Sequence, residues 1–175
     1  MRTKMSSTAK LTVSGLCLAM CLVLPFLTGQ IKEIGSALCP MHLPVFLCGF
    51  ICGWPWGAAV GFVAPILRSA IFHMPVMFPG AVSMAFELAV YGLVSGYIYS
   101  KLPRSTKSTY IALVAAMLFG RAVWGIVRFL MAVLFNLQFT LDMFVAGAFI
   151  TAIPGIALQL LLIPPIVSAV TKEKK

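Results

Sequence analysis

The stretch LPVFLCGFICGWPWGAAVGFVAPILRSAIF, residues 43–72, decides how many helices the sequence predicts. It is apolar almost throughout, yet it is longer than the about 20 residues that cross a bilayer as one helix. The tripeptide Trp54-Pro55-Trp56 divides it. Because proline is favoured in the first turn of a helix and tryptophan at the membrane interface, we interpret the tripeptide as a tight turn. The stretch therefore predicts two helices, 43–53 and 55–72.

On either side of this pair, four further apolar runs each have the length of a membrane-spanning helix. We expect Pro154 to kink the last of them. Basic residues precede the first run, as in a signal peptide, but no small-x-small cleavage site follows it, so this helix is expected to be retained. The sequence thus predicts an all-α membrane protein, a single domain over residues 1–175 with six transmembrane helices. The predicted spans are 8–28, 43–53, 55–72, 80–100, 110–135 and 143–170.

The composition of the whole chain supports this class. Of its 175 residues, 61% are hydrophobic and 10% are charged, and its mean hydropathy is +1.04. Soluble domains average about 25% charged residues, and a soluble protein of this size could not hide so much apolar surface. The composition excludes a disordered chain, a disulfide-rich secreted module and a multidomain enzyme.

Basic residues gather on one predicted side of the membrane. The chain has 13 Lys and Arg against 4 Asp and Glu, a formal charge of +9. With six spans, most of these cations fall on the side of both termini, and only Lys32 falls opposite. Positive loops face the cytoplasm, so we predict cytoplasmic termini and no nucleic-acid partner. The cations on the predicted inner side are Arg2, Lys4, Lys10, Lys101, Arg104, Lys107, Lys172, Lys174 and Lys175.

Four ionisable residues lie within predicted spans: Arg68, Glu87, Arg121 and Arg128. A charge at bilayer depth costs about 2.5–3.5 kcal/mol or more, so each needs a partner or a wet cavity. At about 1.5 Å rise per residue, Arg68, Glu87 and Arg128 fall at similar depth in the outer half of the membrane. Arg121 falls nearer the middle, where it could extend inward instead, so Arg128 is the stronger candidate for ligand contact.

Helical spacing groups these charges with aromatic residues. Arg121, Trp124 and Arg128 share one helix face, and Glu87 shares another with Tyr91. We predict a pocket open to the outside, in which the arginines bind an anionic ligand and Glu87 accepts a hydrogen bond from it. Tyr91 and Trp124 would form its walls.

Two further residues, His73 and Asn136, lie at outer helix ends, where they either contact the ligand or are simply solvated. We read His42, beside a proline at another such end, as a solvated loop residue. The alternative for the embedded charges is a buried Glu87–arginine ion pair that only ties helices together. One glutamate cannot neutralise three arginines, which favours an anionic guest.

Small residues mark helix contacts. Gly49, Gly57, Gly92 and Gly96 fit close internal packing, whereas Gly15 and Ala19 lie where the first helix could meet another subunit. The five cysteines fit small apolar core residues, and a zinc site at Cys39, His42 and Cys48 is the weaker alternative. No ATP-binding G-x-x-x-x-G-K-[ST] and no H-E-x-x-H is present, so no enzyme activity is expected.

The chain resembles the substrate-binding S components of energy-coupling factor (ECF) vitamin transporters over nearly its whole length. The resemblance lies in Gly15-x-x-x-Ala19, in place of the family's Ala-x-x-x-Ala, and in residues 44–57, 61–68 and 84–92. It implies a vitamin-type small molecule captured from outside a bacterial plasma membrane, without a cofactor. It also implies docking of the first helix on a transmembrane coupling subunit that two separate ATPase subunits drive.

The substrate stays open at this point. Embedded arginines favour a carboxylate, so pantothenate is the first candidate, and pyridoxine-type vitamers, riboflavin, folate and a queuosine precursor remain. A stand-alone secondary transporter or channel subunit for a small anionic solute is the alternative function, with Glu87 as a proton carrier.

Overall fold

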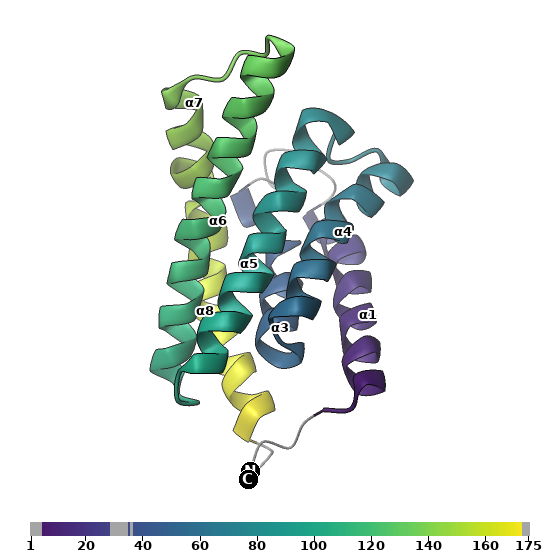
Figure 1. The fold of residues 1–175 in the computed structure, drawn as a ribbon, viewed down its shortest axis with the longest axis vertical. Helices are drawn as coiled ribbons and strands as arrows, with labels where there is room; N and C mark the ends of the chain where they lie inside the picture. The colour runs from purple at the N-terminus through teal and green to yellow at the C-terminus, as the bar shows by residue number, and fades with distance from the viewer. Residues whose placement is uncertain (1–4, 29–34, 36, 173–175) are drawn as a thin grey trace.

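The computed structural model describes residues 5–28, 35 and 37–172, and every regular element among them is helical. Lys32 and the terminal cations Arg2, Lys4, Lys174 and Lys175 lie outside the described residues. The elements form one bundle (Figure 1). In chain order they are α1 (Ser7–Val23), the 3₁₀ turn η1 (Leu24–Thr28), α3 (His42–Cys52), α4 (Trp54–Phe72), the π-turn η2 (Met77–Ala81), α5 (Val82–Lys101), α6 (Thr106–Phe135), α7 (Leu141–Val145), the π-turn η3 (Ala146–Ile150) and α8 (Ile153–Lys172).

One end of the bundle carries the described basic residues of the predicted inner side. Helix α1 begins there, α5 ends, α6 begins and α8 ends (Figure 1). The basic residues at these helix ends are Lys10, Lys101, Arg104, Lys107 and Lys172. The opposite end holds the connections from α4 to α5 and from α6 to α7.

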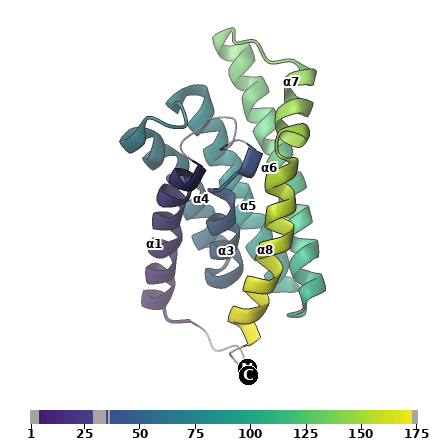
Figure 2. The ribbon, with the colours of Figure 1, turned by 180° about the vertical axis from the view of Figure 1, so that it is seen from behind.

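The apolar runs form helices close to the predicted bounds, and α3 is as short as its predicted bounds implied. Five described helices are long and apolar enough to cross a membrane. Helix α3 has 11 residues and is therefore about 16 Å long, half of a hydrocarbon core of about 30 Å. The described residues thus contain five candidate spans and one short apolar helix within one residue of the predicted 43–53, so the count of six transmembrane helices stays a prediction. Seen from behind, α3 lies between α1 and α8 (Figure 2).

The turn between α3 and α4 is a single residue. Gly53 has φ +100°, a conformation that side chains disfavour, and it ends α3 and begins α4. Trp54 and Pro55 already belong to the first turn of α4. Proline is tolerated there because a backbone N–H in the first turn has no helical partner in any case. The predicted turn is therefore real, but it lies one residue before the Trp-Pro-Trp tripeptide.

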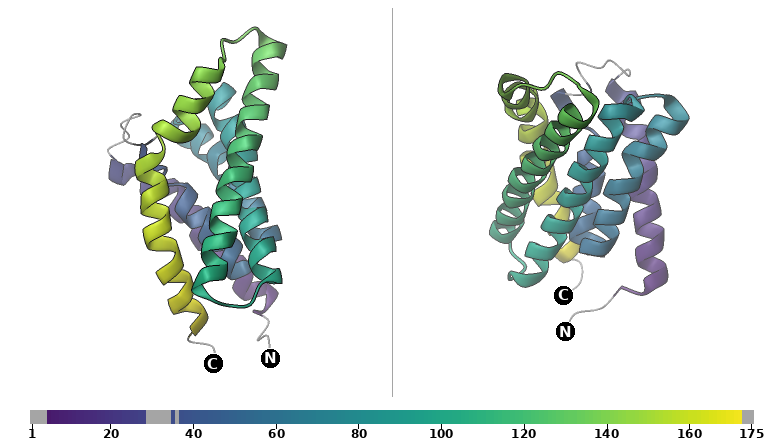
Figure 3. Two further views of the ribbon diagram at one scale, coloured as in Figure 1. Left: turned by 90° about the vertical axis from the view of Figure 1, so that its left-hand side faces the viewer. Right: turned by 45° about the horizontal axis from the view of Figure 1, so that its top comes forward.

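The last predicted span is broken before Pro154, as expected. Helix α7 and the π-turn η3 precede a short turn, and α8 begins at Ile153. Proline in the first turn of α8 needs no backbone donor, so the break falls where the ring costs least. The chain bends there, so that α7 lies near the C-terminal end of α6 and α8 continues toward the opposite end of the bundle (Figure 3, left).

Helices α3, α4 and α5 pack with their backbones almost touching at glycines. A Cβ atom on Gly57 would lie 2.7 Å from the Cα of Gly49, and one on Gly96 would lie 2.6 Å from the Gly49 carbonyl oxygen. Close contact of this kind holds helices together where lipid gives no hydrophobic driving force. These glycines therefore serve internal packing, as predicted.

Helix α1 packs one face on the bundle and leaves another open. Its Ser14, Cys17 and Cys21 are buried against α3 and α4, whereas Gly15 and Ala19 are exposed. A Cβ on Gly15 would meet no atom within 4 Å. The Gly15–Ala19 face is thus free of contacts within the described part of the chain.

Candidate ligand-binding site

A buried ion pair lies at the centre of the bundle. Glu87 of α5 is 2% exposed, and its Oε1 atom lies 2.9 Å from Nη1 of Arg121 on α6. The hydroxyl of Tyr91, one turn further along α5, donates to the same oxygen at 2.8 Å. An ion pair away from water persists only when such hydrogen bonds satisfy it. The arrangement matches the predicted alternative of a helix-tying pair, with Arg121 as the partner.

Small and aromatic neighbours hold this pair in place. The Tyr91 ring stacks on Phe46 of α3, with ring centroids 4.9 Å apart. On its other side it lies against Gly120 of α6, where any side chain would overlap the ring. Gly120 precedes Arg121, so α6 approaches α5 closely enough for the guanidinium to reach Glu87.

His42 completes the cluster, and its position corrects our prediction of a solvated loop residue. It is 3% exposed, and its Nε2 lies 3.8 Å from Oε1 of Glu87, beyond hydrogen-bond distance. Neither ring nitrogen has a hydrogen-bond partner among the described residues. Because α3 is short, its first residue lies deep in the bundle rather than at the surface. The spacing of His42 and Phe46 on one helix face was the only sequence signal for this.

Arg68 stands apart from this cluster. It is 3% exposed and donates a hydrogen bond to the backbone carbonyl of Leu22, at the end of α1 where carbonyls lack helical partners. Its guanidinium carbon lies 5.0 Å from the centroid of the Phe26 ring and 5.2 Å from that of Phe72, and the two rings contact each other edge to face. The predicted grouping of Arg68 with Glu87 in one pocket is wrong. Arg68 joins α4 to α1 instead.

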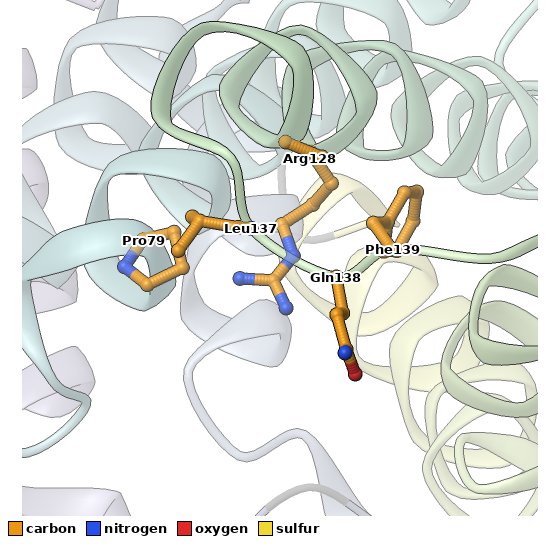
Figure 4. A pocket seen from close by; sticks show the side chains of 6 residues that line it. Pro79, Arg128, Leu137, Gln138 and Phe139 are labelled. Carbon is orange, nitrogen blue, oxygen red and sulfur yellow. The ribbon is translucent and has the colours of Figure 1, made fainter.

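Arg128 lines a pocket at the end of the bundle opposite the described basic residues. The pocket has a volume of about 170 Å³, and Figure 4 shows the guanidinium extending between Pro79 and Gln138. The guanidinium also lies over the rings of Trp124 and Phe139, at 5.8 and 5.6 Å. No carboxylate of the described residues lies within ion-pair distance of it. The lining residues are Pro79, Arg128, Ala132, Leu137, Gln138 and Phe139.

The other two predicted contacts lie outside this pocket. His73 and Asn136 are exposed, with φ of +58° and +51°, and each is the C-terminal cap of its helix, α4 and α6 respectively. In the left-handed conformation their backbone N–H groups reach back to helix carbonyls, so their visible role is to end helices. Sequence reasoning did not place Phe139 in the pocket wall, where it lies.

The cysteines and histidines do not form a metal centre. All five cysteines are buried, and the described residues contain no group of three or more His, Cys, Asp or Glu side chains that could hold a metal ion. The predicted zinc alternative at Cys39, His42 and Cys48 is therefore wrong. Cys39 lies 3.9 Å from Nη2 of Arg121, at the edge of the ionic cluster.

These features define a helical membrane protein with a sealed ion pair in its core and an arginine-lined pocket near one end. The model of the family described as ECF transporter, substrate-specific component, matches residues 9–167, and the chain belongs to this family. No curated protein and no solved structure matches the chain. The predicted resemblance is thus confirmed. The chain is a substrate-binding subunit of an ECF transporter, and its family implies a small-molecule substrate and partner subunits of the ECF module.

Proposed function

We propose that this subunit captures an anionic vitamin at the Arg128 pocket. The observation that carries the proposal is a difference in charge compensation between two arginines on α6. Glu87 neutralises Arg121, whereas Arg128 faces its pocket with no carboxylate among the described residues. A guanidinium binds a carboxylate through two parallel hydrogen bonds, and the Gln138 amide could add a third.

Pantothenate is the first candidate for this ligand. Its carboxylate suits Arg128, and its hydroxyl and amide groups suit the polar wall at Gln138. Pyridoxine-type vitamers, riboflavin, folate and a queuosine precursor remain alternatives. The ligand would not contact the buried cluster, which would hold α5 against α6 deeper in the bundle through Glu87, Arg121 and Tyr91. Trp124 would support the Arg128 guanidinium.

The distribution of charge supports an orientation in the membrane. The described basic residues at the α1, α5, α6 and α8 ends lie together, and positive segments face the cytoplasm. We propose one domain of five long helices and the half-length α3, in a bacterial plasma membrane, with both termini inside. The Arg128 pocket would then open to the outside.

The open face of α1 supports a docking role. Gly15 and Ala19 have no neighbours in the bundle that cover them, and small residues allow another helix to approach closely. We propose that this face binds the transmembrane coupling subunit, with ATP hydrolysis carried out by two further subunits.

Arg128→Gln is expected to lower ligand retention at least tenfold, because it removes the charge that faces the anion. The measurement is mass spectrometry of the small molecule that co-purifies with the solubilised protein. Arg104→Gln, the same change at an exposed position between α5 and α6, should retain the ligand fully. A neutral or cationic molecule bound to the wild type, or equal retention by Arg128→Gln, would refute the proposed anion site.

Gly15→Leu is expected to reduce uptake by the complete transporter at least tenfold and to leave ligand binding by the isolated subunit unchanged. A leucine on the open α1 face keeps another helix away without disturbing the bundle. The measurement is substrate uptake into vesicles that contain the subunit and its ECF module. Ala157→Leu on the exposed side of α8 is the matched control. Normal uptake by Gly15→Leu would remove α1 from the docking role.

A further inference from the structure

An apolar groove adjoins the Arg128 pocket. It lies between α6 and α7, has a volume of about 430 Å³, and shares Phe139 with the pocket. Among the described residues that line it, Thr140 alone has a polar side chain. Its main lining residues are Gly125, Ile126, Phe129, Leu130, Leu141 and Phe144.

Gly125, which lines the groove, lets α7 pack closely on α6 because it has no side chain. A Cβ on Gly125 would overlap the ring of Phe144, so α7 lies directly on the α6 backbone at this point. The residues that form the outer walls of the groove are exposed. Ile126 and Phe129 are each 58% exposed and Leu141 is 77% exposed. The groove thus offers an apolar surface that the bundle itself does not cover.

One side chain separates the groove from the charged pocket. Phe139 lies in the short connection between α6 and α7, outside both helices. Its ring is 5.6 Å from the Arg128 guanidinium carbon and 5.9 Å from the Trp124 ring. A rotation of Phe139 would join the two spaces into one, charged at one end and apolar along the rest.

The order of the two spaces along α6 matches the order of polarity in a membrane. If Tyr110 marks one boundary of the hydrocarbon core, Arg128 lies about 27 Å further along α6, close to the other boundary of a core of about 30 Å. Gly125 and Ala122, which both line the groove, lie deeper than Arg128. An anion at Arg128 would therefore sit at the interface, level with the part of the groove at Phe129 and Leu130 and above its deeper part.

We infer that the ligand is an amphiphilic carboxylate, whose anionic end binds Arg128 and whose hydrocarbon or ring body occupies the α6–α7 groove. The inference rests on the anion site proposed above. It goes further by assigning the rest of the ligand to an apolar surface. By this assignment, a carboxylate with an apolar body binds better than a hydroxylated one of similar size, so such a ligand replaces pantothenate as the first candidate.

The test measures retention of radiolabelled acetate, butyrate, octanoate and pantothenate by the full chain in phosphatidylcholine nanodiscs, using equilibrium dialysis and subtracting empty discs. At least tenfold more octanoate than acetate is expected to be retained. Arg128→Gln should abolish this retention. Ala122→Phe, which fills the groove, should bring the octanoate-to-acetate ratio close to one, whereas Ala157→Phe on the exposed side of α8 should keep the wild-type ratio.

A second variant guards against misfolding of Ala122→Phe. Phe139→Ala removes the wall between the two spaces and should raise octanoate retention severalfold. Three outcomes would overturn the inference. Equal octanoate retention by wild type and Arg128→Gln would mean that the groove only binds bilayer-like chains. Retention of pantothenate through Arg128 without octanoate would refute the apolar site but keep the proposed anion site. Retention of no carboxylate at all would refute both.

Discussion

Glu87→Ala is expected to destabilise the protein by about 3–5 kcal/mol, because it leaves the Arg121 guanidinium buried without its partner. No other carboxylate of the described residues lies within ion-pair distance of Arg121. The hydroxyl of Tyr91 also loses its acceptor. The midpoint of thermal unfolding in detergent, followed by tryptophan fluorescence, should fall sharply or the variant should fail to fold.

The double variant Glu87→Ala/Arg121→Met distinguishes the cost of an unpaired buried charge from the cost of lost packing. Removing both charges and filling the space with an apolar side chain is often neutral for a buried pair, so most of the stability should return. Arg128→Met, which removes a charge that has no carboxylate partner among the described residues, should cost little. If the single and double variants were equally unstable, the cost would come from packing and not from an unpaired charge.

Gly92→Leu is expected to prevent α4 and α5 from packing, a larger effect than ordinary overpacking of about 1–3 kcal/mol. A Cβ on Gly92 would meet the backbone of Gly57 and lie 2.8 Å from the backbone nitrogen of Ala58. Backbone atoms cannot rotate away as a flexible side chain can, so the two helices must separate. Gly92→Ala should cost less, in the same direction.

The matched control is Gly15→Ala, since a Cβ there meets nothing within 4 Å. Alanine favours a helix over glycine by about 1 kcal/mol, so this variant should be as stable as the wild type or slightly more stable. Unfolding midpoints of the purified proteins in one detergent compare the variants. A folded Gly92→Leu with an unchanged midpoint would contradict the close contact of α4 with α5.

The sequence predicted the helices well because their boundaries depend on local chemistry. Long apolar runs form helices in a membrane whatever surrounds them, since their backbone groups must pair within the segment. Proline and glycine then fix where helices start and bend, as Gly53 and Pro154 do. The depth of α3 escaped prediction because an apolar run does not say how far from the surface it begins.

The site was predicted less well because pairing depends on how helices rotate against one another. Helix spacing correctly placed Arg121, Trp124 and Arg128 on one face, but it could not say which arginine would meet Glu87. Gly120 decides that by letting α6 approach Tyr91 and Glu87. Arg68 donates to the backbone carbonyl of Leu22. Every residue has such a carbonyl, so the side chain at position 22 could not predict this contact.

The length of α6 has a consequence for how the membrane acts on this protein. Thirty residues make a rod of about 45 Å, which exceeds a hydrocarbon layer of about 30 Å. The helix must therefore tilt in the membrane or extend beyond it. Which of the two occurs depends on the acyl-chain length of the lipids. In a thin bilayer Arg128 would lie in the aqueous phase, and in a thick bilayer it would lie within the hydrocarbon core. Substrate binding by this subunit should therefore depend on the lipid composition of the membrane.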